Sequence, residues 1–299
     1  MLIGICKLSY SLSYVIVAAL FGIILKLVSL KSHDALSTSL LIFLVSFNSI
    51  VIFHIANRKN LGATYRKLLS LNKIDIFLLP TLVTLSLIGV FYIPLHFTPS
   101  LHAFTYTALT SCCASISVFF KFKTRSNLLI FLTLSIIIIT FYVFNFGQFT
   151  LANFLIMVFA TLSCAIVSYS YFVLSYRFNQ AGLSAIEVLT FRFWPICIIF
   201  GIISIISGEL FQMPLYIIPE TISVSIITFV LPVYLSQKAI EKIGPHLHGM
   251  LLGFVPLLTY ILENIILGIH NFSMLFFSLA LAAMVLLQSI LHTYDKKSK

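Results

Sequence analysis

Charged side chains are scarce in this 299-residue chain. Only 9% of its residues are charged (18 basic and 8 acidic), whereas 60% are hydrophobic and the mean hydropathy is +1.11. A soluble domain is about 25% charged and about 45–50% apolar. So few charges cannot cover the surface of a water-soluble protein of this size, which excludes a soluble enzyme. Cysteine is also rare, at 5 residues, which excludes a secreted disulfide scaffold.

Sequence motifs of catalysis are missing as well. The chain contains no G-x-x-x-x-G-K-[ST] phosphate loop, no G-x-S-x-G, no H-E-x-x-H and no C-x-x-C. We therefore assign no catalytic residue, no metal site and no cofactor, and we expect that the protein is not an enzyme. The net charge of +10 is spread over separate loops, so we expect no nucleic-acid partner.

Long apolar runs dominate what remains. They are continuous, which is typical of membrane-spanning helices of about 20 residues and not of the alternating strands of a barrel. The sequence predicts an all-α membrane protein with ten transmembrane helices and no soluble domain. We place the helices at roughly 8–29, 35–56, 75–96, 99–120, 127–145, 150–175, 183–206, 217–237, 246–268 and 272–292. The longest loop is 57–74.

Basic residues fall almost entirely on one side of this arrangement. Of the 18, only Lys31 lies on the other side, and Lys26 and Arg192 lie inside spans. The other 15 are Lys7, Arg58, Lys59, Arg66, Lys67, Lys73, Lys121, Lys123, Arg125, Arg177, Lys238, Lys242, Lys296, Lys297 and Lys299. Because basic loops stay in the cytoplasm, we expect both termini to be cytoplasmic and the number of spans to be even.

An internal repeat links the two halves of the chain. The segment PSLHA at 99–103 resembles PHLHG at 245–249, at a spacing of 146 residues, and each opens a predicted span. This spacing divides the chain into 1–146 and 147–299, with five spans each. Because five is odd, the second half enters the membrane from the opposite side. The sequence therefore predicts two inverted five-helix repeats, an architecture of secondary transporters that bind substrate near the midplane.

Several segments carry a family resemblance. ALFGIILK at 19–26, LSAIEVLTFRF at 183–193 and the segment at 244–268 resemble parts of the drug/metabolite transporter superfamily, in particular the EamA-type ten-helix permeases. Arg192 and Pro256 stand at the arginine of the seventh helix and the central proline of the ninth. The chain departs from the family at Thr110, where the fourth helix usually has proline. The resemblance implies a ten-helix transporter, more often for export than for uptake.

Two ionisable residues in predicted span 7 are candidates for transport. Arg192 lies near mid-depth, where it could bind a substrate carboxylate or form a structural pair. Glu187 lies closer to the cytoplasmic end and about 140° around the helix from Arg192. We weigh it as a proton-coupling or gating residue against an interfacial carboxylate in contact with water.

Three further residues are proton-coupling or gating candidates in spans 4 and 9. Glu263 lies in the outer part of span 9, where it could take up a proton or be an end-of-helix acid that reaches water. His102 and His248 correspond under the repeat and would occupy opposite mouths of one cavity. The alternative for each histidine is a hydrogen bond to a backbone carbonyl near a helix end.

Predicted span 4 is rich in hydroxyl groups. Tyr106, Thr110 and Ser111 are candidate cavity residues there, with close helix packing as the alternative. In span 9, Pro256 frees a backbone carbonyl that could line a cavity, and Tyr260 lies one turn beyond it. Prolines 80, 195 and 232 could likewise be hinges or ordinary kinks.

These observations favour a secondary-active transporter of a small polar metabolite, such as an amino acid, that works by alternating access and exports its substrate. An uptake carrier or exchanger of the same fold is the alternative. A membrane-embedded enzyme and a passive channel are less favoured. The expected partners are the lipid bilayer and a small-molecule substrate, with a proton as candidate coupling ion and a homodimer left open. The composition suggests a bacterial inner membrane.

Overall fold

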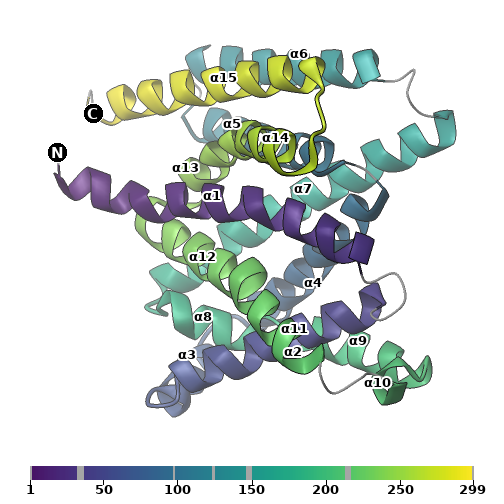
Figure 1. Ribbon diagram of the computed structural model, residues 1–299. Helices are drawn as coiled ribbons and strands as arrows, with labels where there is room; N and C mark the ends of the chain where they lie inside the picture. The colour runs from purple at the N-terminus through teal and green to yellow at the C-terminus, as the bar shows by residue number, and fades with distance from the viewer. Residues whose placement is uncertain are drawn as a thin grey trace.

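The computed structural model describes residues 2–31, 37–96, 98–122, 125–145, 150–212 and 217–297, and these are helical, without β-strands (Figure 1). The helices are α1 (Leu2–Lys31), α2 (Thr38–Ala56), α3 (Leu61–Leu69), α4 (Lys73–His96), α5 (Pro99–Phe122), α6 (Arg125–Asn145), α7 (Leu151–Gln180), α8 (Ala185–Phe191), α9 (Trp194–Ile206), α10 (Glu209–Gln212), α11 (Ile217–Ser225), the π-helix η2 (Ile226–Val230), α12 (Leu231–Ile243), α13 (Pro245–Leu251), the 3₁₀-helix η3 (Leu252–Phe254), α14 (Val255–Leu267) and α15 (Phe272–Lys297).

Eight segments in the described part of the chain are long and apolar enough to cross a membrane. They are Thr38–Ala56, Lys73–Tyr92, Pro99–Phe120, Leu128–Asn145, Leu151–Gln180, Ala185–Ile206, Thr221–Ile243 and Pro245–Leu267. Shorter apolar stretches, Leu8–Ile24 and Phe272–Gln288, lie within α1 and α15. The protein is therefore an all-α, multi-pass membrane protein, as its composition predicts.

The outer faces of these helices are apolar too. On α6, Ile136, Ile139 and Val143 are 63%, 61% and 70% exposed. A helix that is hydrophobic on all sides suits a lipid environment and not water. The polar backbone of each span is satisfied by its own helical hydrogen bonds, so these side chains can face the acyl chains without cost.

Each of the ten predicted ranges coincides with a helix or with a series of consecutive helices. The sequence reading missed α3, which forms inside the predicted loop 57–74. Thr64 and Leu68 lie one turn apart on its buried face, and the amide of Asn57 donates to Oγ1 of Thr64 at 3.0 Å. The predicted boundary between residues 146 and 147, the side chain of Lys26 and several basic residues used for the orientation lie outside the described part.

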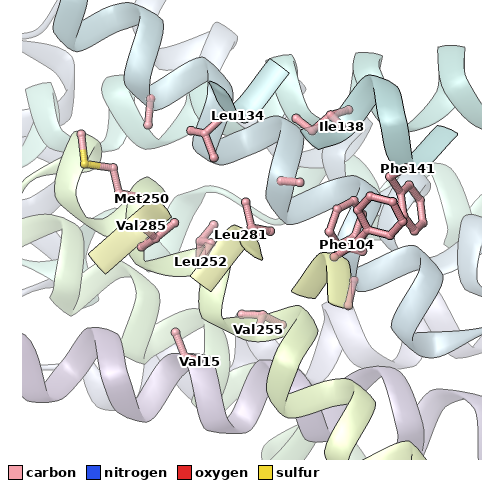
Figure 2. Close-up of a cluster of buried hydrophobic side chains, with 14 of the residues drawn as sticks. Val15, Phe104, Leu134, Ile138, Phe141, Met250, Leu252, Val255, Leu281 and Val285 are labelled. Atoms are coloured by element: carbon pink, nitrogen blue, oxygen red, sulfur yellow. The ribbon is translucent and has the colours of Figure 1, made fainter. Parts of the chain in front are cut away.

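Two hydrophobic clusters hold the helices together. The first joins α1, α5, α6, α7, α13, η3, α14 and α15, and Figure 2 shows part of it. At its centre the rings of Phe104 and Phe141 lie 4.1 Å apart, and Leu281 and Val285 of α15 pack against the same cluster. α15 lies beside α6, and α1 begins at the same end of the molecule at which α15 ends (Figure 1).

The second cluster joins α2, α3, α4, α8, α9 and η2 with the last turns of α7. Phe53 of α2 stacks on Phe193 at 6.2 Å, and Phe193 in turn meets Phe229 of η2 edge to face at 5.4 Å. Because lipid is as apolar as these side chains, close packing and not exclusion from water stabilises both clusters. Residues of both clusters face one another across a cavity, Leu252 and Val255 from the first and Val83 and Phe229 from the second.

Candidate functional site

Three predicted spans are interrupted near the middle of the molecule, each next to a proline. Pro195 stands in the first turn of α9 after a break from α8, Pro232 in the first turn of α12 after the π-helix, and Pro256 in the first turn of α14 after the 3₁₀ turn. Proline lacks an N–H and so removes one helical hydrogen bond. Pro80 behaves differently, since α4 runs through it without a break. Irregular backbone inside a membrane is tolerated where it lines a cavity or is buried in protein.

A cavity of about 100 Å³ lies at these interruptions, between the two hydrophobic clusters. That volume exceeds what several water molecules need. Its wall is built from α1, α4, α5, α7, the α8–α9 junction, η2, α12, η3 and α14. Its polar lining residues include Tyr14, His102, Tyr106, Tyr171, Arg192 and Ser236.

Arg192 lies at the junction of α8 and α9 and is 2% exposed. Its Nη1 donates to Oε1 of Gln237 at 3.0 Å, and the guanidinium carbon lies over the ring of Tyr171, 5.3 Å from the ring centroid. Ion pairs of the described residues do not include Arg192, and its Nε has no hydrogen-bond partner among those residues. The cavity therefore borders a buried positive charge that neutral groups surround.

His102 lies one turn into α5 and also lines the cavity. Its ring stacks on Tyr106, with the centroids 5.9 Å apart and the planes at 13°. Nδ1 of His102 has no hydrogen-bond partner in the described part of the chain. Helix α5, which carries both of these side chains, packs against α7.

His248, the counterpart of His102 in the repeat, lies one layer behind the cavity wall. Nδ1 is hydrogen-bonded to Oγ of Ser11 at 3.0 Å, and Nε2 to Oγ of Ser236 at 2.9 Å. Its ring centroid lies 5.2 Å from that of Tyr14. Tyr14 and Ser236 line the cavity, whereas His248 supports both of them from behind. The two histidines thus occupy different environments.

Four predicted cavity residues lie outside this lining. Thr110 donates to the carbonyl of Tyr106 at 2.7 Å, and Ser111 to the carbonyl of Gly249 at 3.1 Å, which joins α5 to α13. Pro256 is buried at the start of α14, and Tyr260 is buried in the first cluster. The bond from Ser111 to α13 fits the packing alternative raised for span 4. Of the cavity residues named from sequence, Arg192 and Tyr106 line the cavity.

Glu187 lies in the first turn of α8 and is not part of the cavity lining. It forms a capping box with Ser184, and its carboxylate accepts hydrogen bonds from the backbone N–H of Ser184 at 2.7 Å, from Nζ of Lys67 at 3.0 Å and from Oγ1 of Thr64 at 3.1 Å. A capping box satisfies helix-end N–H groups that have no helical partner. Lys67 and Thr64 belong to α3, so Glu187 fastens α3 to α8.

Glu263 is 1% exposed on α14. Its Oε2 accepts a hydrogen bond from the backbone N–H of Ser100 at 3.2 Å, in the first turn of α5. A carboxylate there is favoured by the partial positive charge of the helix N-terminus. Ser100 follows Pro99, which lines the cavity, so Glu263 lies directly behind one end of it.

Sequence reasoning missed three residues of the site. Tyr14 and Tyr171 line the cavity, and Gln237 binds Arg192. The tyrosines were missed because tyrosine is expected at membrane interfaces, and Tyr171 lies close to the end of its predicted span, 150–175. Gln237 gave no signal either, because it is the last residue of predicted span 217–237, where a polar amide can reach water.

No protein-family model matches the chain, and no curated protein matches it. Among solved structures, one described as "Crystal structure of protein" is similar to it, with a TM-score of 0.63 and 16% sequence identity. The match covers 94% of this chain and 98% of that one. At this identity the likeness concerns the fold alone.

Proposed function

We propose that the protein is a secondary-active transporter of a small polar metabolite, such as an amino acid or a similar compound. The observation that carries the proposal is the cavity with the buried Arg192 at the meeting point of three interrupted helices. Interrupted helices around a midplane site are the usual way in which such carriers bind their substrates. Alternating access would then move the two hydrophobic clusters relative to one another around this cavity.

Helix pairings support the proposed inverted repeats. If the first five predicted spans map onto the last five, α1 corresponds to α7, α4 to η2–α12 and α5 to α13–α14. The contact of α4 with α7 then has its counterpart in that of α1 with α12, and the contact of α5 with α7 in that of α1 with α14. The contact of α5 with α6 has its counterpart in that of α14 with α15, and the pairs α2 with α9, α5 with α14 and α6 with α15 map onto themselves. A twofold axis in the membrane plane would produce this pattern.

The proposal includes ten spans with both termini in the cytoplasm of a cell with an inner membrane. The basic loops support this orientation. The architecture is similar to that of the drug/metabolite transporters that the sequence resembles, and on this basis we propose export as the direction. A proton is the proposed coupling ion, and Glu263 and His102, at one end of the cavity, are the candidates to carry it.

Counterflow in proteoliposomes tests this function. Vesicles loaded with an unlabelled candidate metabolite should take up the labelled compound faster than empty vesicles, because a carrier returns loaded more readily than empty. Arg192→Ala should abolish this flux while insertion into the membrane stays near normal. A channel or an enzyme would show no acceleration by internal substrate, and wild-type flux in Arg192→Ala would contradict a binding role for this residue.

A further inference from the structure

Two buried polar atoms on side chains that line the cavity lack partners in the described residues. They are Nε of Arg192 and Nδ1 of His102, in side chains that are 2% and 7% exposed. Buried polar atoms are hydrogen-bonded in the great majority of cases, and an unpaired buried charge is costly. Two such atoms on one cavity wall indicate that a ligand completes the site.

The charge of the wall limits the chemistry of that ligand. Arg192 is the permanently charged side chain of the described lining, and no aspartate or glutamate belongs to that lining. Gln237 and Tyr171 orient the guanidinium but leave its charge uncompensated. A guanidinium has a rigid fork of donors that matches a carboxylate, and such charge-assisted pairs are strong in a low-dielectric site.

The rest of the wall is elongated and mostly apolar, with the hydroxyl side chains Ser86, Thr107, Thr228 and Thr259 among its apolar residues. Phe21, Val83, Val90 and Phe229 contribute to it, and the lining of α1 runs from Tyr14 to Gly22, which is about 12 Å along a helix. Arg192 lies at the Tyr14 end. It donates to Gln237, whose neighbour Ser236 bonds to His248, and the ring centroid of His248 lies 5.2 Å from that of Tyr14.

His102 belongs to the opposite end of this wall. Gly22 meets Pro99 there, with the Cβ position of the glycine 3.7 Å from Cβ of Pro99, and His102 follows Pro99 by one turn of α5. The wall therefore has a cation at one end, a histidine near the other and apolar surface between them.

We propose that this cavity binds a small organic monocarboxylate with an apolar body. Its carboxylate pairs with Arg192, its body lies against the apolar wall, and His102 binds a polar group at its far end. The inference rests on the proposed transport function and narrows the polar metabolite to a chemical class.

A set of three ligands with the same carbon chain tests the head group. Hexanoate, hexanamide and hexylamine are titrated by calorimetry into the full chain in nanodiscs, with empty nanodiscs as the blank. We expect hexanoate to bind at least about tenfold more tightly than the other two. Arg192→Gln should lower the affinity for hexanoate by about 10- to 100-fold, and Arg192→Lys should lower it by less. Arg177→Gln, which removes an exposed cation at the end of α7, should leave binding unchanged.

The far end of the ligand is tested with 6-hydroxyhexanoate. Its hydroxyl should increase affinity over hexanoate in the wild type by about three- to tenfold, and His102→Ala should remove this gain, so that the variant binds the two ligands with equal affinity. The same gain in both proteins, or no gain in the wild type, would refute the role of His102. Thermal unfolding of each variant verifies folding. If Arg192→Gln fails to fold, the three-ligand comparison on the wild type still decides the head group.

Failure of this inference and failure of the transport function give different results. Tight hexanoate binding without counterflow would contradict the transporter and leave the carboxylate site standing. Counterflow of hexylamine or hexanamide in preference to hexanoate would overturn the carboxylate site and leave the transporter standing. Equal binding of all three ligands would also overturn it, because a site without charge selectivity does not use Arg192.

Discussion

Arg192 and Gln237 form a hydrogen bond of 3.0 Å in which a neutral amide, and not a carboxylate, accepts from the buried guanidinium. The amide nitrogen of Gln237 in turn donates to Oδ1 of Asn179 at 3.0 Å, so the glutamine is itself fixed in place. A buried cation is normally paired with an acid. Here the protein orients the charge without neutralising it, which suits the proposed binding of a ligand carboxylate.

We therefore expect Gln237→Glu to inhibit transport. The new carboxylate would occupy nearly the same position about 3 Å from the guanidinium and would compete with a ligand anion. Flux should fall at least about tenfold, which corresponds to about 1.4 kcal/mol of lost binding. The thermal midpoint should stay the same or rise, because the buried charge gains a counter-ion. The two measurements are counterflow and thermal unfolding on the same preparation.

Gln288→Glu is the matched control. Gln288 is also fully buried, but it exchanges hydrogen bonds with Ser115 on α5, away from the cavity lining. A carboxylate there would have no cation beside it, so we expect a loss of stability of about 3 kcal/mol. A thermal midpoint that is unchanged or raised in Gln237→Glu and lowered in Gln288→Glu would support an uncompensated charge on Arg192. Equal destabilisation by both would contradict it.

We expect Glu187 to have a structural role, joining α3 to α8 through its hydrogen bonds, and not to carry a proton. Glu187→Gln keeps a side chain that can complete the capping box, so it should cost less than about 1 kcal/mol, the usual value of an exposed ion pair. Lys67 is 45% exposed, which keeps that contribution small. Glu187→Ala loses the box as well and should cost about 1–2 kcal/mol. Transport and its pH profile should survive in Glu187→Gln. A flattened pH profile in that variant would restore Glu187 as a coupling residue.

A second carboxylate, that of Glu209, joins the start of α2 to the segment after α9 through hydrogen bonds. Glu209 accepts hydrogen bonds from Oγ of Ser37 at 2.5 Å and from Oγ of Ser39 at 2.9 Å. The bond from Ser37 is the main reason why the pKa of Glu209 is held below its ordinary value of 4.5. A carboxylate with a lowered pKa stabilises the folded state above the unfolded-state pKa and loses this effect as the pH falls through the folded-state value.

We expect the thermal midpoint of the wild type to decrease more steeply below about pH 4.5 than that of Glu209→Gln. The difference should be small, well under about 1 kcal/mol, because the carboxylate is largely solvated. Thermal unfolding between pH 7 and pH 3 measures it. The same pH dependence of the thermal midpoint in both proteins would show that the hydrogen bonds of the Glu209 carboxylate contribute nothing to stability.

Long continuous apolar runs located the helices well because lipid imposes a simple rule on a spanning segment: about 20 apolar residues with satisfied backbone. Arg192 was found from sequence for the same reason, since an ionisable residue at mid-depth is conspicuous. The helix interruptions were less accessible. Pro195, Pro232 and Pro256 coincide with changes in helix geometry and Pro80 does not, so the presence of proline alone does not locate them.

The contacts between spans could not be predicted in this way. Ser111 and Tyr106 lie five residues apart on α5, yet one bonds to α13 and the other lines the cavity. A helix that packs on several neighbours has no single polar face that periodicity can identify. The partners of Glu187 come from α3, an element whose burial of Thr64 and Leu68 depends on the fold around it.

Orientation in the membrane can be tested at two exposed positions. Asn60 precedes α3 in the basic loop, and Gln212 ends α10 on the segment after α9. The proposed topology puts them on opposite sides, with the basic loop in the cytoplasm. In a background without the five native cysteines, Gln212→Cys should react with a membrane-impermeant maleimide on intact cells. Asn60→Cys should react only after the membrane is opened. Labelling of both positions from outside, or the reverse pattern, would refute the orientation. The placement of Glu263 toward the outer side of the membrane would then fail as well.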